Sequence, residues 1–269
     1  MAAIPARIAR AWSIAGILLG VAVALVRFAP ASWATDAVAT ATDGRVMLAD
    51  AQGTVWDGSA LPVLSAGGDS RESLALPSRL EWTIRPGIAG LNLTLVHACC
   101  LPQPMQWTVV PGWNQVRMAL VAEGSSTAMA QWPAGWLAGL GTPWNTLQPG
   151  GLIQFSSPGM SLHRVQGRWQ LDGQAQIDFM NASSRISTLD RLGSYRIDLS
   201  GRAQPGEAIA LTISTLEGVL QISGTGQGTP TGLRFRGEAH AAPGQEAPLN
   251  NLLNIIGRRS GAISVISIG

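Results

Sequence analysis

A repeated alternation of apolar and polar residues limits most strongly how this chain can fold. Residues 80–85 read LEWTIR and residues 91–95 read LNLTL, so every second side chain is apolar. Successive side chains of a β-strand point to opposite faces of a sheet, and this pattern therefore predicts strands with one apolar face. Pro86-Gly87 and Ala89-Gly90 separate the two segments, which predicts a hairpin.

Related segments bounded by Gly or Pro follow along the chain, at residues 176–179, 195–199, 209–213, 219–222 and 233–238. In the second of them Tyr195, Ile197 and Leu199 share one face, while Arg196 and Asp198 point the other way. Such strands bury one face and expose the other to water, as antiparallel sheets do. With 32 glycines and 16 prolines favouring turns, they predict a mainly β fold of curved antiparallel sheets, forming a half-open barrel or groove.

Residues 248–256 are predicted to form a short amphipathic helix packed on a sheet. A proline lies at the expected first position and Gly257 follows the end. Four apolar residues recur at helical spacing, namely Leu249, Leu252, Leu253 and Ile256.

A second helical turn is expected at residues 131–140, which are rich in Trp and Ala and end at Gly141. We expect this turn to join two β halves of the domain around residues 125–150. The sequences GTVWDG at 53–58 and GRWQLDG at 167–173 echo each other, but glycine-bounded strands produce such echoes by chance, so no repeat is inferred.

The N-terminal segment has the composition of a membrane anchor. Residues 11–26 read AWSIAGILLGVAVALV without a charge, Arg7 and Arg10 precede them, and Arg27 follows. An apolar run with basic residues in front predicts a transmembrane helix whose N-terminal end lies in the cytoplasm.

The predicted bounds are a cytoplasmic start at residues 1–10, an anchor at residues 11–29 and a periplasmic β domain at residues 30–269, all in a single-pass protein of the bacterial inner membrane. The uninterrupted run has 16 residues. A helix needs about 20 to cross the hydrocarbon, so a cleaved signal peptide is the alternative, with Ser32-Trp33-Ala34 as its cleavage site. Both interpretations export the domain.

Charge argues against nucleic acid as a partner. All 18 basic residues are arginine, and three of them flank the apolar run, which leaves 15 basic residues against 16 acidic ones. A nucleic-acid surface requires an excess of positive charge that this balance does not supply.

No metal or cofactor site is expected. His97, His163 and His240 lie far apart in sequence, and we find no metal-ligand partner at usable spacing for any of them. The glycine-rich residues 224–228 do not form a phosphate loop, because the chain has no lysine and no helical pattern follows; we expect a β-turn there.

No catalytic residue is expected either, and we expect that the protein is not an enzyme. No Gly-x-Ser-x-Gly motif occurs among the serines. The aspartates that could supply paired carboxylates fit solvated strand faces and turns equally well; they are Asp57, Asp172, Asp178, Asp190 and Asp198. A periplasmic hydrolase would rest on these unremarkable groups alone.

Cys99 and Cys100 are adjacent and are the only cysteines. An exported chain meets an oxidising compartment, where a disulfide between neighbours would fix a turn at residues 98–102. Two buried thiols and a bond to a partner are the alternatives.

Four segments together resemble the type II secretion system protein N family, also called general secretion pathway protein N. They are GTVWDG at residues 53–58, LAGLGTPWNTLQPGG at 137–151, SSRISTLDRLGSYRIDLSG at 183–201 and LRFRGEAHAAPGQEAPLNNLLNIIGRRSG at 233–261. The resemblance implies one transmembrane helix, a periplasmic domain, and an accessory role in moving folded proteins from the periplasm across the outer membrane. The family has no assigned catalytic or cofactor residues to carry over.

Two functions follow as expectations. In the first, strand edges and the tryptophans Trp132, Trp136 and Trp144 contact other inner-membrane or periplasmic subunits of the secretion system. Tryptophan supplies a large contact area, although most of the ten tryptophans are expected to pack in the core or in loops.

In the second, the protein binds or transfers lipid or another hydrophobic ligand. The family's apolar-lined sheets look like those of AsmA-type lipid-handling proteins, a likeness of fold only. The side chains expected to line the groove are Leu93, Leu95, Ile197, Leu199 and Ile222. One-sided alternation predicts a closed core equally well.

Overall fold

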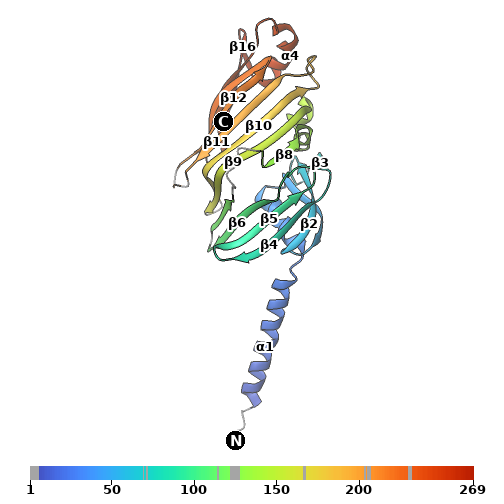
Figure 1. Cartoon of the computed structure of the whole chain (residues 1–269), viewed down its shortest axis with the longest axis vertical. Coiled ribbons are helices and arrows are strands. Elements are labelled where there is room, and N and C mark those ends of the chain that lie inside the picture. Colours follow the sequence, from blue (N-terminus) through green and yellow to red (C-terminus); the bar gives the residue numbers. More distant parts are fainter. Residues whose placement is uncertain are drawn as a thin grey trace.

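One antiparallel sheet of sixteen strands dominates the computed structural model, which describes residues 6–68, 70, 72–113, 115–121, 128–165, 168–202, 204, 207–229 and 232–269. The sheet is open, with β1 and β15 at its two ends (Figure 1). Nearly every strand pairs with its neighbour in sequence, in the order β1-β2-β4-β5-β6-β7-β9-β10-β11-β12-β13-β14-β16-β15, while β3 pairs with β2 and β8 with β9.

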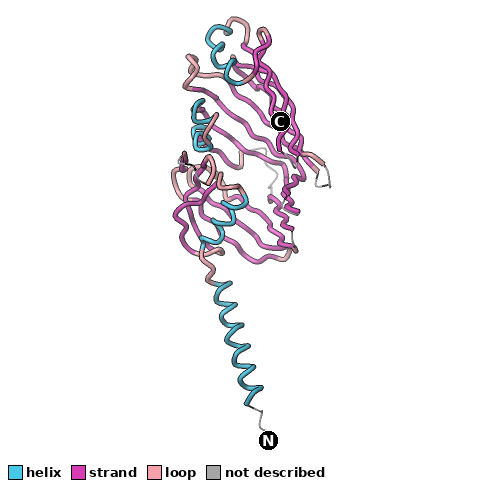
Figure 2. Tube along the Cα trace, turned by 180° about the vertical axis from the view of Figure 1, so that it is seen from behind, coloured by secondary structure: helices cyan, strands magenta, loops and turns pink. Residues whose placement is uncertain are grey.

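The first half of the sheet contains β1 Val46–Gly53, β2 Asp57–Ser65, β3 Ser73–Ala75, β4 Leu80–Gly87, β5 Gly90–His97, β6 Met105–Gly112, β7 Gln115–Leu120 and β8 Ala130–Pro133. The second half contains β9 Pro149–Val165, β10 Arg168–Ser184, β11 Gly193–Gly201, β12 Ile209–Gly218, β13 Leu220–Thr229, β14 Gly232–Ala241, β15 Arg258–Ser260 and β16 Ile263–Ile268. Pairing of β7 with β9 makes the two halves one continuous sheet (Figure 2).

The helices are α1 Ala6–Arg27, α2 Ala31–Ala41, the 3-10 helix η1 Ala134–Leu140, α3 Trp144–Leu147 and α4 Glu246–Ile256. Helix α1 projects away from the sheet (Figure 1). The predicted helix at 248–256 is confirmed as α4, which begins two residues earlier. The segment 131–140 is helical only from Ala134, because the residues before it form β8.

Helix α2 was not predicted. Its sequence, ASWATDAVATA, is rich in alanine, the residue with the highest intrinsic helix propensity. Ala31 is buried in one core cluster with Ala60 of β2 and Trp82 of β4. Packing on the first hairpin therefore stabilises a helix that has a weak apolar pattern of its own.

Within the described residues, no helix has both the length and the apolar character that crossing a membrane requires. The transmembrane helix expected at residues 11–29 therefore stays a prediction.

The expected hairpin of residues 80–95 is confirmed, since β4 pairs with β5 from Leu80↔His97 to Gly87↔Gly90. The other predicted segments lie in β10 to β14, with Val219 just before the start of β13.

The β-turn expected at residues 224–228 is wrong, because these residues lie inside β13 and pair with both β12 and β14. The glycines make room for an aromatic ring from the next strand. A Cβ on Gly224 would lie 2.5 Å from Cζ of Phe235, a side chain that is only 6% exposed. Glycine in a strand interior commonly marks such a close approach.

The sheet has one apolar and one polar face. Residues directly opposite each other in an antiparallel pair share a face. The register aligns Trp82, Leu95 and Met105 across β4, β5 and β6. Further along, it aligns Ile177, Ile197 and Ile213 across β10, β11 and β12, with Asp178, Arg196 and Ser214 on the opposite face.

Short elements cover the apolar face in three separate places. Helix α2 packs over Trp82, β8 contributes Ala130 to a cluster with Met105, and α4 packs over Leu220 and Ala239. Between these places lies a row of apolar side chains that belong to none of the three clusters, and we call it the uncovered strip. Each of these side chains is half-buried. The members of the strip are Ile177, Ile197, Leu199, Leu211 and Ile213.

Candidate functional site

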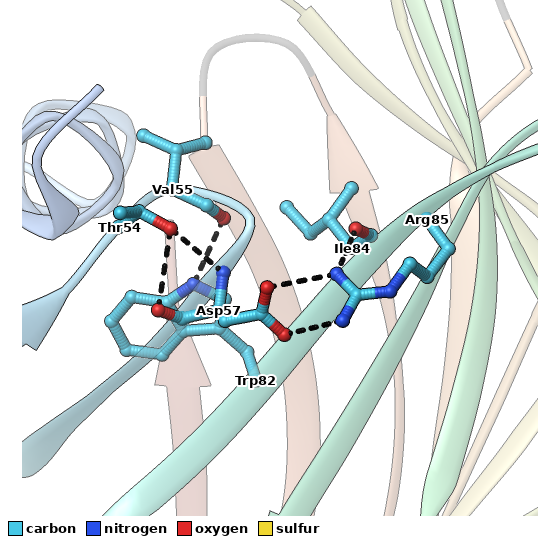
Figure 3. Close-up of polar contacts among 6 residues, drawn as sticks. All are labelled: Thr54, Val55, Asp57, Trp82, Ile84 and Arg85. Atoms are coloured by element: carbon cyan, nitrogen blue, oxygen red, sulfur yellow. Dashed lines mark hydrogen bonds and ion pairs between the residues drawn. The ribbon is translucent and has the colours of Figure 1, made fainter. Parts of the chain in front are cut away.

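The connection between β1 and β2 carries the sequence GTVWDG and forms a tight turn (Figure 3). Thr54 N donates to Asp57 O at 2.8 Å, and Asp57 N donates to Thr54 Oγ1 at 3.1 Å. Gly53 has φ 85°, and a Cβ there would lie 2.4 Å from Asp57 O. Glycine is therefore required where the turn begins.

This turn holds the end of α1. Trp56 Nε1 donates to Val26 O at 2.7 Å, and Val55 N donates to Ala29 O at 2.9 Å. The acceptor at Val26 belongs to the last helical turn, whose carbonyl groups have no partner within the helix. The indole thus satisfies a helix-terminal carbonyl and fixes where the helix leaves the sheet.

The same turn is also fastened to β4. Trp82 Nε1 donates to Val55 O at 3.0 Å, and Ile84 N donates to Trp56 O at 2.7 Å. Gly58 lies against the Trp82 ring, since a Cβ on Gly58 would approach the ring to 2.4 Å. Helix, turn and strand therefore form one connected junction.

Asp57 and Arg85 form a two-pronged ion pair at this junction, with N–O distances of 2.7 and 2.9 Å (Figure 3). Hydrogen bonding from Arg85 lowers the pKa of the Asp57 carboxyl below its ordinary value, and the charge of Arg27 adds to the effect. The Arg85 side chain is 58% exposed and the Asp57 side chain is 53% exposed, so water screens the pair. Its main effect is to orient the two groups.

A cavity of about 750 Å³ lies between the end of α1 and β4. Its walls are largely apolar with guanidinium groups among them; the lining residues are Val23, Val26, Arg27, Trp56, Asp57, Ile84, Arg85 and Pro86. Arg27 also stacks over the Phe28 ring, 5.7 Å from its centroid. The junction thus joins apolar surface to positive charge.

The three tryptophans expected to contact partners lie in β8, η1 and α3, and all are half-buried. Trp136 Nε1 donates to Leu74 O at 2.8 Å, which ties η1 to β3. Trp132 packs in the cluster around Met105. Two of the three therefore have structural contacts within the chain.

The most exposed large apolar side chains among the described residues were not predicted. Ile88 lies between β4 and β5, and Trp113 lies between β6 and β7. Both side chains are fully exposed, with relative exposures of 111% and 99%. The two tips are neighbours, because Leu91 pairs with Val109 at this end of β5 and β6. An apolar residue directly after a Pro-Gly pair, at residues 86–87 and 111–112, is the sequence signal that could have found them.

Cys99 and Cys100 form a disulfide. His97 Nδ1 lies 3.4 Å from Cys99 Sγ, so the expectation that no histidine has a ligand-type neighbour is wrong for His97. The spacing His-x-Cys-Cys was visible in the sequence. His163 Nε2 instead lies 3.0 Å from Ser161 Oγ.

Of the carboxylates considered as catalytic candidates, Asp178 and Asp198 lie near each other beside Arg196 on the polar face, whereas Asp57 lies at the β1–β2 turn. Asp57 pairs with Arg85, and Asp178 pairs with Arg196 at 2.8 Å on the polar face of the sheet. Each of these two carboxylates thus has an arginine partner.

These features define a class: single-sheet antiparallel β proteins in which the first hairpin holds an N-terminal helix. The chain belongs to the family described as type II secretion system (T2SS), protein N, whose model matches residues 44–265. This confirms the resemblance carried by the sequence motifs and gives the chain a role in type II secretion. No curated protein and no solved structure matches the chain.

Proposed function

We propose that this chain is an accessory inner-membrane component of the type II secretion system. In this proposal α1 anchors it in a single pass, the sheet lies in the periplasm, and contacts with other subunits support the export of folded proteins across the outer membrane. Family membership supports the link to secretion. The exposed apolar surface of α1 is the observation that supports the proposed membrane anchor.

The described part of α1 presents apolar side chains outward. Ile17 is 65% exposed, Leu19 is 68% exposed and Val23 is 60% exposed. Contiguous apolar surface of this kind on a projecting helix is typical of a segment that contacts lipid. Phe28 and Arg27 at its end suit the membrane–water interface.

The tips at Ile88 and Trp113 support the same placement. Pro86 lines the cavity beside Val23 and Val26, so the β4–β5 turn lies close to the end of α1. Tryptophan and isoleucine at such tips can enter the interfacial layer next to an anchor helix. The domain would then rest on the membrane surface beside its own helix.

The edge formed by β15 and β16 is the best contact surface for another subunit. β15 covers only residues 263–265 of β16, so residues 266–268 pair with β14 alone. An unpaired strand edge accepts a strand from another protein through main-chain hydrogen bonds.

Deletion of the gene and complementation test the proposal. We expect folded export substrates to accumulate in the periplasm of the deletion strain and the full chain to restore secretion. A photo-crosslinker at exposed Ser267 should capture a secretion subunit, while one at exposed Asp198 on the polar face serves as the control. Unchanged secretion in the deletion strain would contradict the proposal.

The uncovered strip favours a second candidate function, binding of a lipid acyl chain. Five half-buried apolar side chains on three adjacent strands form it. Native mass spectrometry of the full chain should show retained phospholipid, and the double variant Ile197→Asp Ile213→Asp should lose it. Asp198→Asn, on the opposite face, is the matched control. A lipid-free spectrum of the unaltered chain would count against binding.

A further inference from the structure

The turn that follows β5 gathers three potential metal ligands. His97 ends the strand, and Cys99 and Cys100 follow it. The ligand atoms of the three side chains all lie within 4.8 Å of one another. His97 is 2% exposed and Cys100 is 1% exposed, whereas Cys99 is exposed and gives access from solvent.

The hydrogen bonds of His97 define which ring nitrogen is free. Nε2 lies 3.2 Å from Ser78 O and 3.4 Å from Ser78 Oγ; because a carbonyl oxygen can only accept, we assign the tautomer in which Nε2 carries the proton and donates it to Ser78 O. Nδ1 then has a free lone pair, and it faces Cys99 Sγ at 3.4 Å. A histidine held by a carbonyl on one nitrogen and open on the other is the usual arrangement of a metal-ligating histidine.

Main-chain hydrogen bonds hold the turn without help from sulfur. His97 O accepts from Cys100 N at 3.1 Å and from Leu101 N at 3.0 Å. Cys100 O accepts from Gln131 N at 2.8 Å, which ties the turn to β8. Breaking the sulfur–sulfur bond therefore leaves the three ligands close together.

We propose that the reduced pair Cys99–Cys100 and His97 bind one thiophilic d10 metal ion, Cu(I) or Zn(II). A dithiol reductant transfers two electrons and two protons to the disulfide and becomes a disulfide itself. The ion then displaces both thiol protons, so that two thiolates and the Nδ1 lone pair ligate it. Disulfide and metal site are alternative states of the same turn.

The donor set selects this class of ion. Thiolate and imidazole ligands favour Cu(I) and Zn(II), whereas magnesium and calcium need oxygen ligands. Two thiolates and a neutral imidazole suit three-coordinate Cu(I), and for Zn(II) a water entering beside exposed Cys99 completes four ligands.

Titration of the full chain in detergent micelles tests the site. The protein is reduced with dithiothreitol, freed of reductant under nitrogen, and titrated with Cd(II), whose thiolate charge-transfer absorption reports sulfur ligation. Cu(I) is titrated in parallel against a chromophoric chelator. We expect the reduced protein to bind one equivalent of either ion and the oxidised protein to bind none.

Variants assign the ligands. Cys99→Ser should remove most of the charge-transfer absorption, and it alters an exposed side chain, so the fold should persist. His97→Gln should weaken binding by at least about tenfold. His163→Gln is the matched control and should bind like the unaltered chain.

Because His97 is buried, replacing it can disturb the fold, so cadmium NMR of the unaltered protein gives a second readout. The chemical shift of the bound cadmium distinguishes a nitrogen ligand from an oxygen ligand beside two sulfurs. The proposal is overturned if the reduced chain binds no more tightly than the Cys99→Ser Cys100→Ser variant. It is equally overturned if folded His97→Gln binds like His163→Gln, or if the cadmium shift shows no nitrogen ligand.

Discussion

The indole of Trp56 donates a hydrogen bond of 2.7 Å to the main-chain oxygen of Val26, thirty positions earlier in the chain. This bond links the first hairpin of the sheet to the last turn of α1. Together with the Val55–Ala29 bond it fixes the direction in which the helix leaves the domain.

Replacing Trp56 by Phe should loosen this junction while leaving the sheet intact. The ring remains but its N–H is lost, which removes a hydrogen bond worth about 1 kcal/mol. We expect faster amide hydrogen exchange at residues 26–29 and an almost unchanged urea midpoint. Trp113→Phe, at an exposed tip, is the control and should change neither. Unaltered exchange in Trp56→Phe would show that the indole does not hold the helix.

Replacing Asp178 by Asn should lower stability more at pH 7 than at acid pH. Hydrogen bonding from Arg196, with a smaller contribution from Gln176, lowers the pKa of the Asp178 carboxyl in the folded protein. A depressed folded-state pKa adds stability above the unfolded pKa, near 3.9, and this stability is lost as the pH falls through the lower folded value.

For this partly screened pair we expect a loss of up to about 1 kcal/mol at pH 7 in urea unfolding. Asp172→Asn is the control, because Asp172 forms no ion pair with the described residues. An equal loss at pH 7 and pH 3 would mean that charge is not the cause.

Two glycines of β13 should respond differently to alanine. A Cβ on Gly224 would meet Phe235 Cζ at 2.5 Å and main-chain atoms of β14, whereas a Cβ on Gly228 would meet its nearest neighbour at 3.4 Å. Overpacking costs about 1–3 kcal/mol, so Gly224→Ala should lower the free energy of unfolding by that amount. Gly228→Ala should stay within about 0.5 kcal/mol of the unaltered chain. Similar urea midpoints for both variants would contradict the crowding at Gly224.

The tips at Ile88 and Trp113 should lie in the lipid interface if the proposed membrane placement holds. Spin labels at Ile88→Cys and Trp113→Cys, in the full chain reconstituted in nanodiscs, should be relaxed more by oxygen than by a water-soluble nickel complex. A label at exposed Ala262, in the turn between β15 and β16, should show the reverse. Tips that behave like the Ala262 label would place the hairpins in water.

Local patterns predicted the elements whose partners are close in sequence. The hairpin of β4 and β5 follows from alternation and a four-residue turn, and α4 follows from the spacing of Leu249, Leu252 and Leu253. The glycines of β13 were wrongly predicted to form a turn. Glycine is needed there to make room for the ring of Phe235, which belongs to the next strand.

Contacts set by register could not be predicted. Asp57 and Arg85 are 28 positions apart, and only the pairing of β2 with β4 brings them together. The site at His97 is different, because its three ligands lie within four consecutive residues. There the spacing was visible in the sequence, and the missing information was the hydrogen bond that His97 Nε2 donates to Ser78 O.

The sequential order of the strands in the sheet affects the order in which they can pair as the chain folds. From β4 to β14 along the main path, each strand pairs with the one before it and the one after it, apart from the short branch of β8. Contacts between neighbours in sequence close small loops and form quickly. A chain that emerges N-terminus first can therefore add most strands of its sheet one at a time, whereas β7 has to wait for β9, because Gln115 pairs with Val165, fifty positions later.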